Sequence, residues 1–148
     1  MMEIRILDIH DEYWDKTIEM SEKCSWRAGA KLGHKMRDNK FKDFECVFVA
    51  IEDHKVIGFC TITITDYIPN CSYTPWIGFV FVDENYRGNR LSQKMIEEVL
   101  EYAKIKGIKK VYISTEEDNL YEKYGFIQID TLKSHRDTIE RILVFDML

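Results

Sequence analysis

The fold is decided at residues 86–92, Tyr86-Arg87-Gly88-Asn89-Arg90-Leu91-Ser92, where the pattern of apolar residues changes. Before them lies a continuous apolar run, Ile77-Gly78-Phe79-Val80-Phe81-Val82, which is typical of a buried strand. After them, apolar residues recur at helical spacing from Leu91 to Ala103, and Gly107 then supplies a helix stop. The sequence therefore predicts a strand, a tight basic turn and a helix in immediate succession.

The turn between this strand and this helix is a predicted anion site. Backbone N–H groups in the first turn of a helix have no partner within it, and the helix dipole adds partial positive charge there. Arg87 and Arg90 add full positive charges, while Gly88 accepts a positive φ and has no Cβ to obstruct a ligand. The predicted ligand is a phosphate or pyrophosphate. The alternative is a pair of arginines that only keeps the surface solvated.

A second motif follows the strand-like residues 111–114, and it reads Leu120-Tyr121-Glu122-Lys123-Tyr124-Gly125-Phe126. Together with the turn at residues 86–92, and with the same order of elements, it resembles the GNAT superfamily of N-acetyltransferases. The resemblance covers nearly the whole chain. The pair of motifs carries it, because either motif alone is a weak signal.

The resemblance implies an α/β (α+β) fold in which residues 1–148 form one N-acetyltransferase domain. Its sheet should be mixed, mostly antiparallel and twisted, with about six to seven strands and about four flanking helices. Gly78 should mark a bulge or a close approach within its strand. The sequence pattern places strands near 2–7, 44–51, 56–65, 76–82, 108–114, 126–131 and 139–148, and helices near 13–24, 26–36, 91–106 and 120–124.

In the resembled family the basic turn cradles the pyrophosphate of acetyl-CoA, which makes acetyl-CoA the implied cosubstrate. The strand before the turn splays from its neighbour in that family, and its main-chain groups pair with the pantetheine arm. The chain departs from the family at Arg90, which replaces a usual glycine, and at Ser92, which replaces a glycine or alanine. The implied cofactor-binding residues are Val80, Phe81, Val82, Arg87, Gly88, Asn89, Arg90, Leu91 and Ser92.

Tyr121 occupies the position at which the family carries a tyrosine beside the thioester sulfur. A phenol at hydrogen-bond distance can protonate the CoA thiolate as it leaves, so Tyr121 is the predicted catalytic acid. The alternative is a packing role, which most tyrosines of a small aromatic-rich domain have. Tyr124 falls at a variable position of the motif and is predicted to be a core residue.

The acceptor side is predicted from acidic and aromatic residues. An attacking amine must first lose a proton from an ammonium whose pKa is about 10. Glu116, Glu117 and Asp118 follow a predicted strand, and Asp66 ends the preceding hairpin. Any of them could take the proton or bind a cationic acceptor, although a solvated acidic loop is the alternative. Trp26 could form the floor of the pocket, so the predicted acceptor-binding residues are Trp26, Asp66, Glu116 and Glu117.

Composition disfavours nucleic acid, metal ions and membranes as binding partners. The net charge of −5 disfavours nucleic acid, because phosphate contacts need a basic face. The four cysteines show no CxxC spacing and no accompanying histidines, so no metal is expected. Neither a signal peptide nor an apolar stretch of membrane-spanning length is present, which predicts a cytoplasmic protein without a membrane partner. A homodimer is left open.

Two classes of function fit this sequence. The first is transfer of an acetyl group from acetyl-CoA to an amine by direct attack in a ternary complex, since no cysteine–histidine pair offers a nucleophile. The second is a non-catalytic acyl-CoA-binding sensor or interaction module, against which the presence of Tyr121 argues. Nucleotide hydrolysis is disfavoured because the glycine-rich loop with its Lys-Ser/Thr ending is absent. The acceptor stays open among small-molecule amines, antibiotics, peptide N-termini and lysine side chains.

Overall fold

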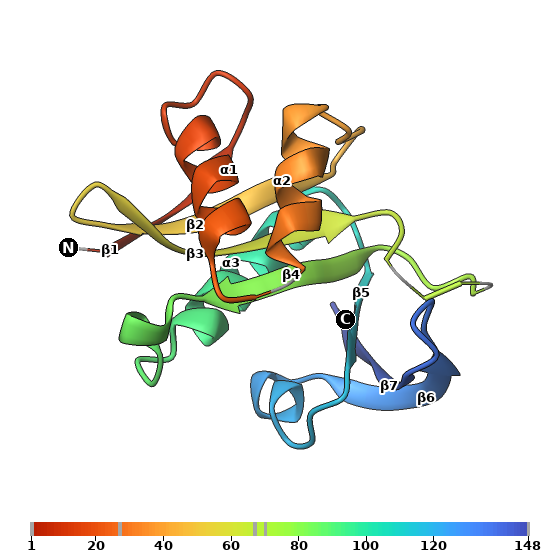
Figure 1. Ribbon diagram of the computed structural model, residues 1–148. Helices are drawn as coiled ribbons and strands as arrows, with labels where there is room; N and C mark the ends of the chain where they lie inside the picture. The colour runs from red at the N-terminus through yellow and green to blue at the C-terminus, as the bar shows by residue number, and fades with distance from the viewer. Residues whose placement is uncertain (1, 27, 67, 70, 148) are drawn as a thin grey trace.

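The computed structural model describes residues 2–26, 28–66, 68–69 and 71–147. Its centre is a seven-stranded mixed sheet in the order β1-β2-β3-β4-β5-β7-β6 (Figure 1). Neighbouring strands run antiparallel except β4 and β5, which run parallel. The strands are β1 (Met2–Leu7), β2 (Cys46–Glu52), β3 (Lys55–Thr63), β4 (Trp76–Val82), β5 (Lys110–Thr115), β6 (Ile127–Lys133) and β7 (Ile139–Asp146). The predicted mixed, mostly antiparallel sheet is confirmed.

Three α-helices cover this sheet within the described residues: α1 (Tyr13–Lys23), α2 (Gly29–Arg37) and α3 (Leu91–Ile105). The predicted count of about four is one too high. The segment expected as a fourth helix forms only a 3-10 turn, η2 (Tyr121–Tyr124), because Gly125 at φ 98° takes the left-handed conformation and ends it after one turn. A second 3-10 turn, η1 (Glu84–Tyr86), precedes α3.

The helices lie on both faces of the sheet, α1 and α2 on one and α3 on the other (Figure 1). The alternation along β2 explains these layers, since successive strand residues point to opposite faces. Val47 and Val49 pack with α1 and α2, whereas Phe48 and Ala50 pack with α3, and all four are fully buried. At β2, helices therefore cover both faces of the sheet.

β4 and β5 part soon after they meet. They pair only at Trp76 and Tyr112, where the Tyr112 N–H donates to the Pro75 carbonyl at 2.9 Å. Every other pair of neighbouring strands is paired at five or more positions. The remainder of β4 consequently presents a free backbone edge toward β5, as the divergence of the two strands in Figure 1 shows.

A bulge in β4 accompanies this separation. Phe59 of β3 pairs with Phe81, but Thr61 pairs with Gly78, so β4 carries one additional residue between these positions. Phe79 absorbs it with a φ of 51°. The irregularity expected at Gly78 is thus a bulge whose strained residue lies one position later.

Candidate active site

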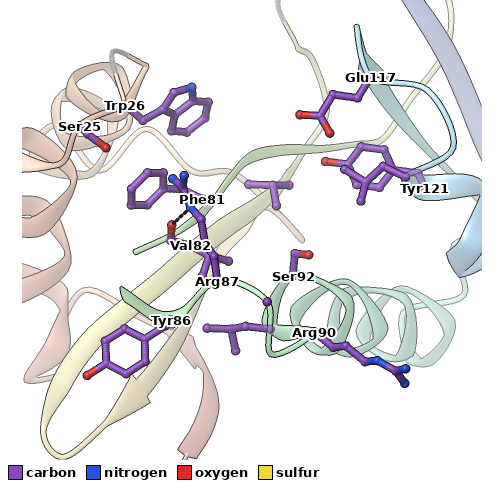
Figure 2. A pocket seen from close by; sticks show the side chains of 14 residues that line it. Ser25, Trp26, Phe81, Val82, Tyr86, Arg87, Arg90, Ser92, Glu117 and Tyr121 are labelled. Atoms are coloured by element: carbon purple, nitrogen blue, oxygen red, sulfur yellow. Dashed lines mark hydrogen bonds between the residues drawn. The ribbon is translucent and has the colours of Figure 1, made fainter. Parts of the chain in front are cut away.

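A cavity of about 560 Å³ lies where β4 parts from β5 (Figure 2). Four segments surround it: the loop before α2, the end of β4, the turn into α3, and the loop with η2 that follows β5. Its lining consists of Ser25, Trp26, Val80, Phe81, Val82, Tyr86, Arg87, Gly88, Arg90, Leu91, Ser92, Glu117, Leu120 and Tyr121.

The fold brings most of the predicted site residues to this one cavity. Asn89, Asp66 and Glu116 are the predicted residues that are absent from its lining. Sequence reasoning missed Ser25, Tyr86 and Leu120, although each is a direct neighbour of a residue that was predicted. Their positions establish proximity, while their roles toward a ligand stay predictions.

Of the three predicted residues that do not line the cavity, two make hydrogen bonds within the protein and one is exposed. The Asn89 side-chain amide donates to the Tyr86 carbonyl at 3.5 Å, within the turn itself. Asp66 accepts a hydrogen bond from Ser114 Oγ at 3.2 Å, which ties the loop after β3 to β5. Glu116 is exposed to solvent.

The start of α3 is built to leave its N–H groups available. Arg90 is the N-cap residue, with φ 59° and ψ 27°, and no side chain caps the helix. Gly88 has a φ of 86°, which only glycine adopts readily. The first N–H groups of α3 therefore keep their capacity to bind an anion, and the helix dipole favours negative charge there.

Arg87 is held against the end of β4. Its Nε donates to the Val82 carbonyl at 2.9 Å (Figure 2), and its guanidinium lies 5.5 Å from the centre of the Phe81 ring. The side chain is thus oriented before any ligand arrives. One of the main-chain acceptors expected to meet a pantetheine arm already receives a hydrogen bond from the turn.

An aromatic wall closes the cavity on the side of α2. The half-buried Trp26 ring stacks on Phe81, with centroids 6.0 Å apart and planes 5° from parallel. Phe79 meets Trp26 edge-on at 6.2 Å, and Phe59 stacks on Phe81 at 5.3 Å. Of these rings, Trp26 and Phe81 line the cavity, which is therefore aromatic on this side.

Tyr121 lies across the cavity from this wall, and its hydroxyl points into the open space (Figure 2). The residue is 8% exposed, and its ring meets Phe126 and Tyr124 edge-on. Burial, followed by the charge of Glu117, raises the pKa of the Tyr121 phenol well above its ordinary value. The enclosed phenol is therefore protonated at neutral pH and beyond the pH at which a free tyrosine ionises.

Glu117 is the candidate base that the fold places beside Tyr121. Its carboxylate lies over the same space as the phenol (Figure 2), and no other acidic residue lines the described part of the cavity. Its N–H donates to Thr115 Oγ1 at 3.0 Å, which fixes the start of the loop. A phenol and a carboxylate thus face one cavity.

Tyr124 connects the two sides of the cavity. Its hydroxyl and Ser92 Oγ are 3.3 Å apart, so one donates a hydrogen bond to the other. The ring packs against the core as predicted, but the residue is only half-buried. Tyr124 therefore joins η2 to the start of α3 as well as filling space.

The family model for the acetyltransferase (GNAT) family matches residues 6–126. The chain belongs to the GNAT family, whose chemistry is acyl transfer. Among curated protein sequences, no match was found.

Solved structures share this GNAT fold. A candidate GNAT acetyltransferase from Desulfovibrio desulfuricans aligns with a TM-score of 0.76 at 13% identity, and each chain is covered to 100%. A GNAT-family acetyltransferase from Streptococcus pneumoniae aligns at 0.72 with 15% identity, again over 100% of both chains. An aminoglycoside 6′-N-acetyltransferase complexed with coenzyme A aligns at 0.72 with 14% identity, over 99% of this chain and 97% of that one.

Two further observations concern the described residues alone. None of their helices has the length and apolar character that crossing a bilayer requires. Their histidine, cysteine and acidic side chains form no group of three that could hold a metal ion.

Proposed function

We propose that this GNAT protein transfers an acetyl group from acetyl-CoA to an amine by direct attack in a ternary complex. The observation that carries the proposal is the opening of the Arg87–Ser92 turn and the Tyr121 hydroxyl onto one cavity. The coenzyme A complex of the aminoglycoside 6′-N-acetyltransferase, which shares the fold, supports the choice of cosubstrate. Cysteine is missing from the described lining, which favours direct transfer over a covalent acyl-enzyme.

The residues present fit a CoA thioester. The uncapped start of α3, Gly88 and Arg87 would hold the pyrophosphate through N–H groups and positive charge. The edge of β4 from Val80 to Val82 that faces β5 would pair with the pantetheine arm, except at the Val82 carbonyl, which already accepts a hydrogen bond from Arg87. When bound, acetyl-CoA supplies an acetyl group activated as a thioester.

Tyr121 acts as the general acid in this proposal. As the carbon–nitrogen bond forms and the carbon–sulfur bond breaks, its hydroxyl donates a proton to the departing sulfur. It then regains a proton from solvent. A phenol is protonated at neutral pH with or without a raised pKa, so Tyr121 enters the reaction with a proton to donate.

Glu117 and Trp26 receive the acceptor. Glu117 attracts its ammonium group and begins the path by which that group loses its proton, since only the neutral amine attacks. The face of Trp26 stabilises the same positive charge or an apolar part of the acceptor. An amine therefore fits the chemistry of the cavity better than an alcohol or a carboxylate.

A free-CoA assay tests this proposal. The protein is mixed with acetyl-CoA and a panel of monoamines, diamines and lysine-containing peptides, and thiol release and acetylated amine are both measured. We expect thiol release that depends on protein and amine together, with the acetylated amine appearing in equal amount. Binding of acetyl-CoA without any acetylated product from the panel would favour the sensor function instead.

A further inference from the structure

Arg141 of β7 lies outside the cavity, yet its guanidinium joins three segments around the reactive side. Nη1 donates to the Glu117 carbonyl at 2.6 Å, and Nη2 donates to the Glu122 carboxylate. Nε donates to Gln128 Oε1 on β6 at 2.9 Å. Only 19% of the side chain is exposed, so each guanidinium nitrogen is engaged in a largely enclosed position.

The register of the sheet explains why an arginine at this position reaches the loop. Arg141 lies opposite Thr115, the last residue of β5, so its side chain starts where the chain leaves the sheet. Both backbone polar groups of Glu117 are then held, its N–H by Thr115 Oγ1 and its carbonyl by Arg141. The loop that carries the candidate base is therefore anchored to the scaffold through backbone groups.

Glu122 extends the same anchor to the candidate acid, because it follows Tyr121 directly in η2. One of its carboxylate oxygens bonds Arg141, and the other is buried without a hydrogen-bond partner among the described residues. The hydrogen bond from Arg141 holds the pKa of the Glu122 carboxyl below its usual range. Removing the arginine would leave a half-buried negative charge unpaired and would displace the turn that carries Tyr121.

We infer that Arg141 is a positioning residue for acyl transfer, which sets the placement of the Glu117 carboxylate relative to the Tyr121 hydroxyl by tying both of their segments to β7. The inference rests on the proposed function, in which Glu117 acts on the attacking amine and Tyr121 on the departing sulfur of one acyl transfer. A misplacement of about 1 Å in such an arrangement costs on the order of a hundredfold in rate. Arg141 itself contacts neither substrate.

Arg141→Gln is the variant that tests the inference. Single-turnover transfer is measured at saturating acetyl-CoA, with the amine from the panel that gives the most product. We expect the rate to fall by roughly tenfold to a hundredfold, while the affinity for acetyl-CoA changes by less than about twofold. Arg141→Lys should recover only part of the rate, because one ammonium cannot replace a planar fork with three engaged nitrogens.

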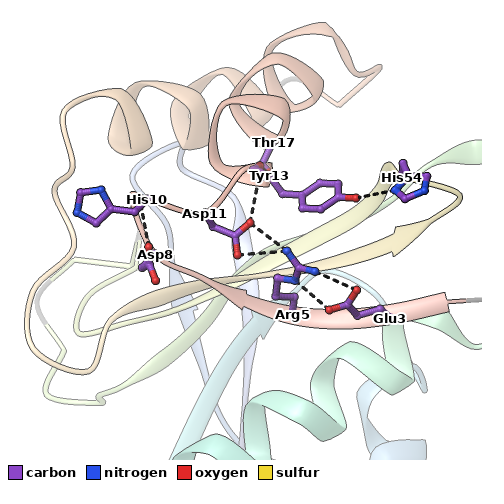
Figure 3. A network of polar contacts seen from close by, with 8 residues as sticks. All are labelled: Glu3, Arg5, Asp8, His10, Asp11, Tyr13, Thr17 and His54. Carbon is purple, nitrogen blue, oxygen red and sulfur yellow. Dashed lines mark hydrogen bonds and ion pairs between the residues drawn. The ribbon is translucent and has the colours of Figure 1, made fainter.

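Arg5→Gln is the matched control. Arg5 is also a multiply bonded arginine, which donates to Glu3 at 2.9 Å and to Asp11 at 3.2 Å and stabilises the start of α1 (Figure 3). Its network lies away from the cavity. Arg5→Gln should therefore lower the melting temperature without changing the rate of acetyl transfer beyond about twofold.

Two results would overturn the inference. The first concerns the double variant of Arg141→Gln and Glu117→Gln. If its loss of rate equals the product of the two single losses, Arg141 does not act through Glu117, because a residue that acts through another must show non-additive effects. The second is unchanged amide hydrogen exchange at residues 116–125 in Arg141→Gln. We expect faster exchange than in the wild type at residues 116–125 and an unchanged exchange rate at residues 86–92. The exchange measurement decides the point even if the wild-type protein acetylates no amine, which is the outcome that would instead contradict the proposed function.

Discussion

The two sides of the cavity are built by different means. The turn at residues 86–92 takes its shape from consecutive residues, two of them at positive φ, and from the first N–H groups of α3. The side that carries Glu117 and Tyr121 depends on contacts between distant segments, above all those of Arg141. Local backbone geometry suits the binding of a common cofactor. Long-range side-chain contacts suit the placement of reacting groups, so changes on the two sides should separate affinity from rate.

Tyr121→Phe should give the largest effect and should fall on rate alone. The ring and its packing are kept, so acetyl-CoA affinity should stay within about twofold, whereas single-turnover transfer should fall by roughly two to four powers of ten. Stopped-flow or quenched-flow measurement of the acetylated product checks this.

The control for Tyr121→Phe is Tyr124→Phe, which removes the hydrogen bond with Ser92. This bond contributes about 1 kcal/mol to the free energy of unfolding, so we expect a slightly lower melting temperature and little change in the rate of transfer. If both variants transfer acetyl groups at the wild-type rate, Tyr121 is a packing residue.

Arg87→Ala should show the opposite pattern. Loss of a charged hydrogen-bond donor to the pyrophosphate should weaken CoA by roughly tenfold to a hundredfold, with the rate at saturation nearly unchanged. Calorimetric titrations with CoA and with pantetheine, which lacks the pyrophosphate, provide the comparison. Equal losses for both ligands would mean that Arg87 mainly supports β4 through the Val82 carbonyl.

Ionisation of the Tyr121 phenol should make the free energy of unfolding depend on pH. Because the pKa of Tyr121 is raised above the ordinary value of about 10, the folded protein keeps this phenol protonated where an unfolded chain ionises it. Its contribution to the free energy of unfolding is thus present below about pH 10 and is lost as the pH rises above it. The phenolate absorbance of wild type minus Tyr121→Phe should show no ionisation near pH 10. A normal titration there would contradict the enclosed environment.

Arg90→Gly should give the smallest effect. Glycine adopts the left-handed φ without strain, so we expect a gain of about 1 kcal/mol in the free energy of unfolding and a rise of about 2–4 °C in melting temperature. CoA affinity should change by less than about threefold, because the exposed Arg90 side chain is directed away from Phe81 (Figure 2). A tenfold weakening would assign the pyrophosphate to Arg90 instead.

Sequence alone predicted the features that neighbouring residues determine. The strand–turn–helix at residues 76–105 follows from apolar periodicity and from the glycine of the turn, and the order of the remaining strands along the chain follows from similar patterns. The place of Tyr121 came from a motif. Each of these signals is carried by residues close together in the chain.

Three other features of the fold and the site could not be predicted from the apolar pattern of neighbouring residues. The family resemblance implied the parting of β4 from β5, and Gly78 indicated the bulge that accompanies it, but apolar periodicity carries neither signal. Arg141 on β7 resembles any polar residue of an alternating strand until the register places it beside the end of β5. The α-helix predicted at residues 120–124 is instead a single 3-10 turn, because the segment is short and Gly125 ends it.

Titration calorimetry of the wild-type protein with CoA shows whether the cavity between β4 and β5 holds this molecule. We predict binding of about one CoA per chain, with a matching rise in melting temperature, because a ligand that binds only the folded state stabilises it. The absence of any binding heat and of any thermal shift at millimolar CoA or acetyl-CoA would mean that this cavity is not a CoA site.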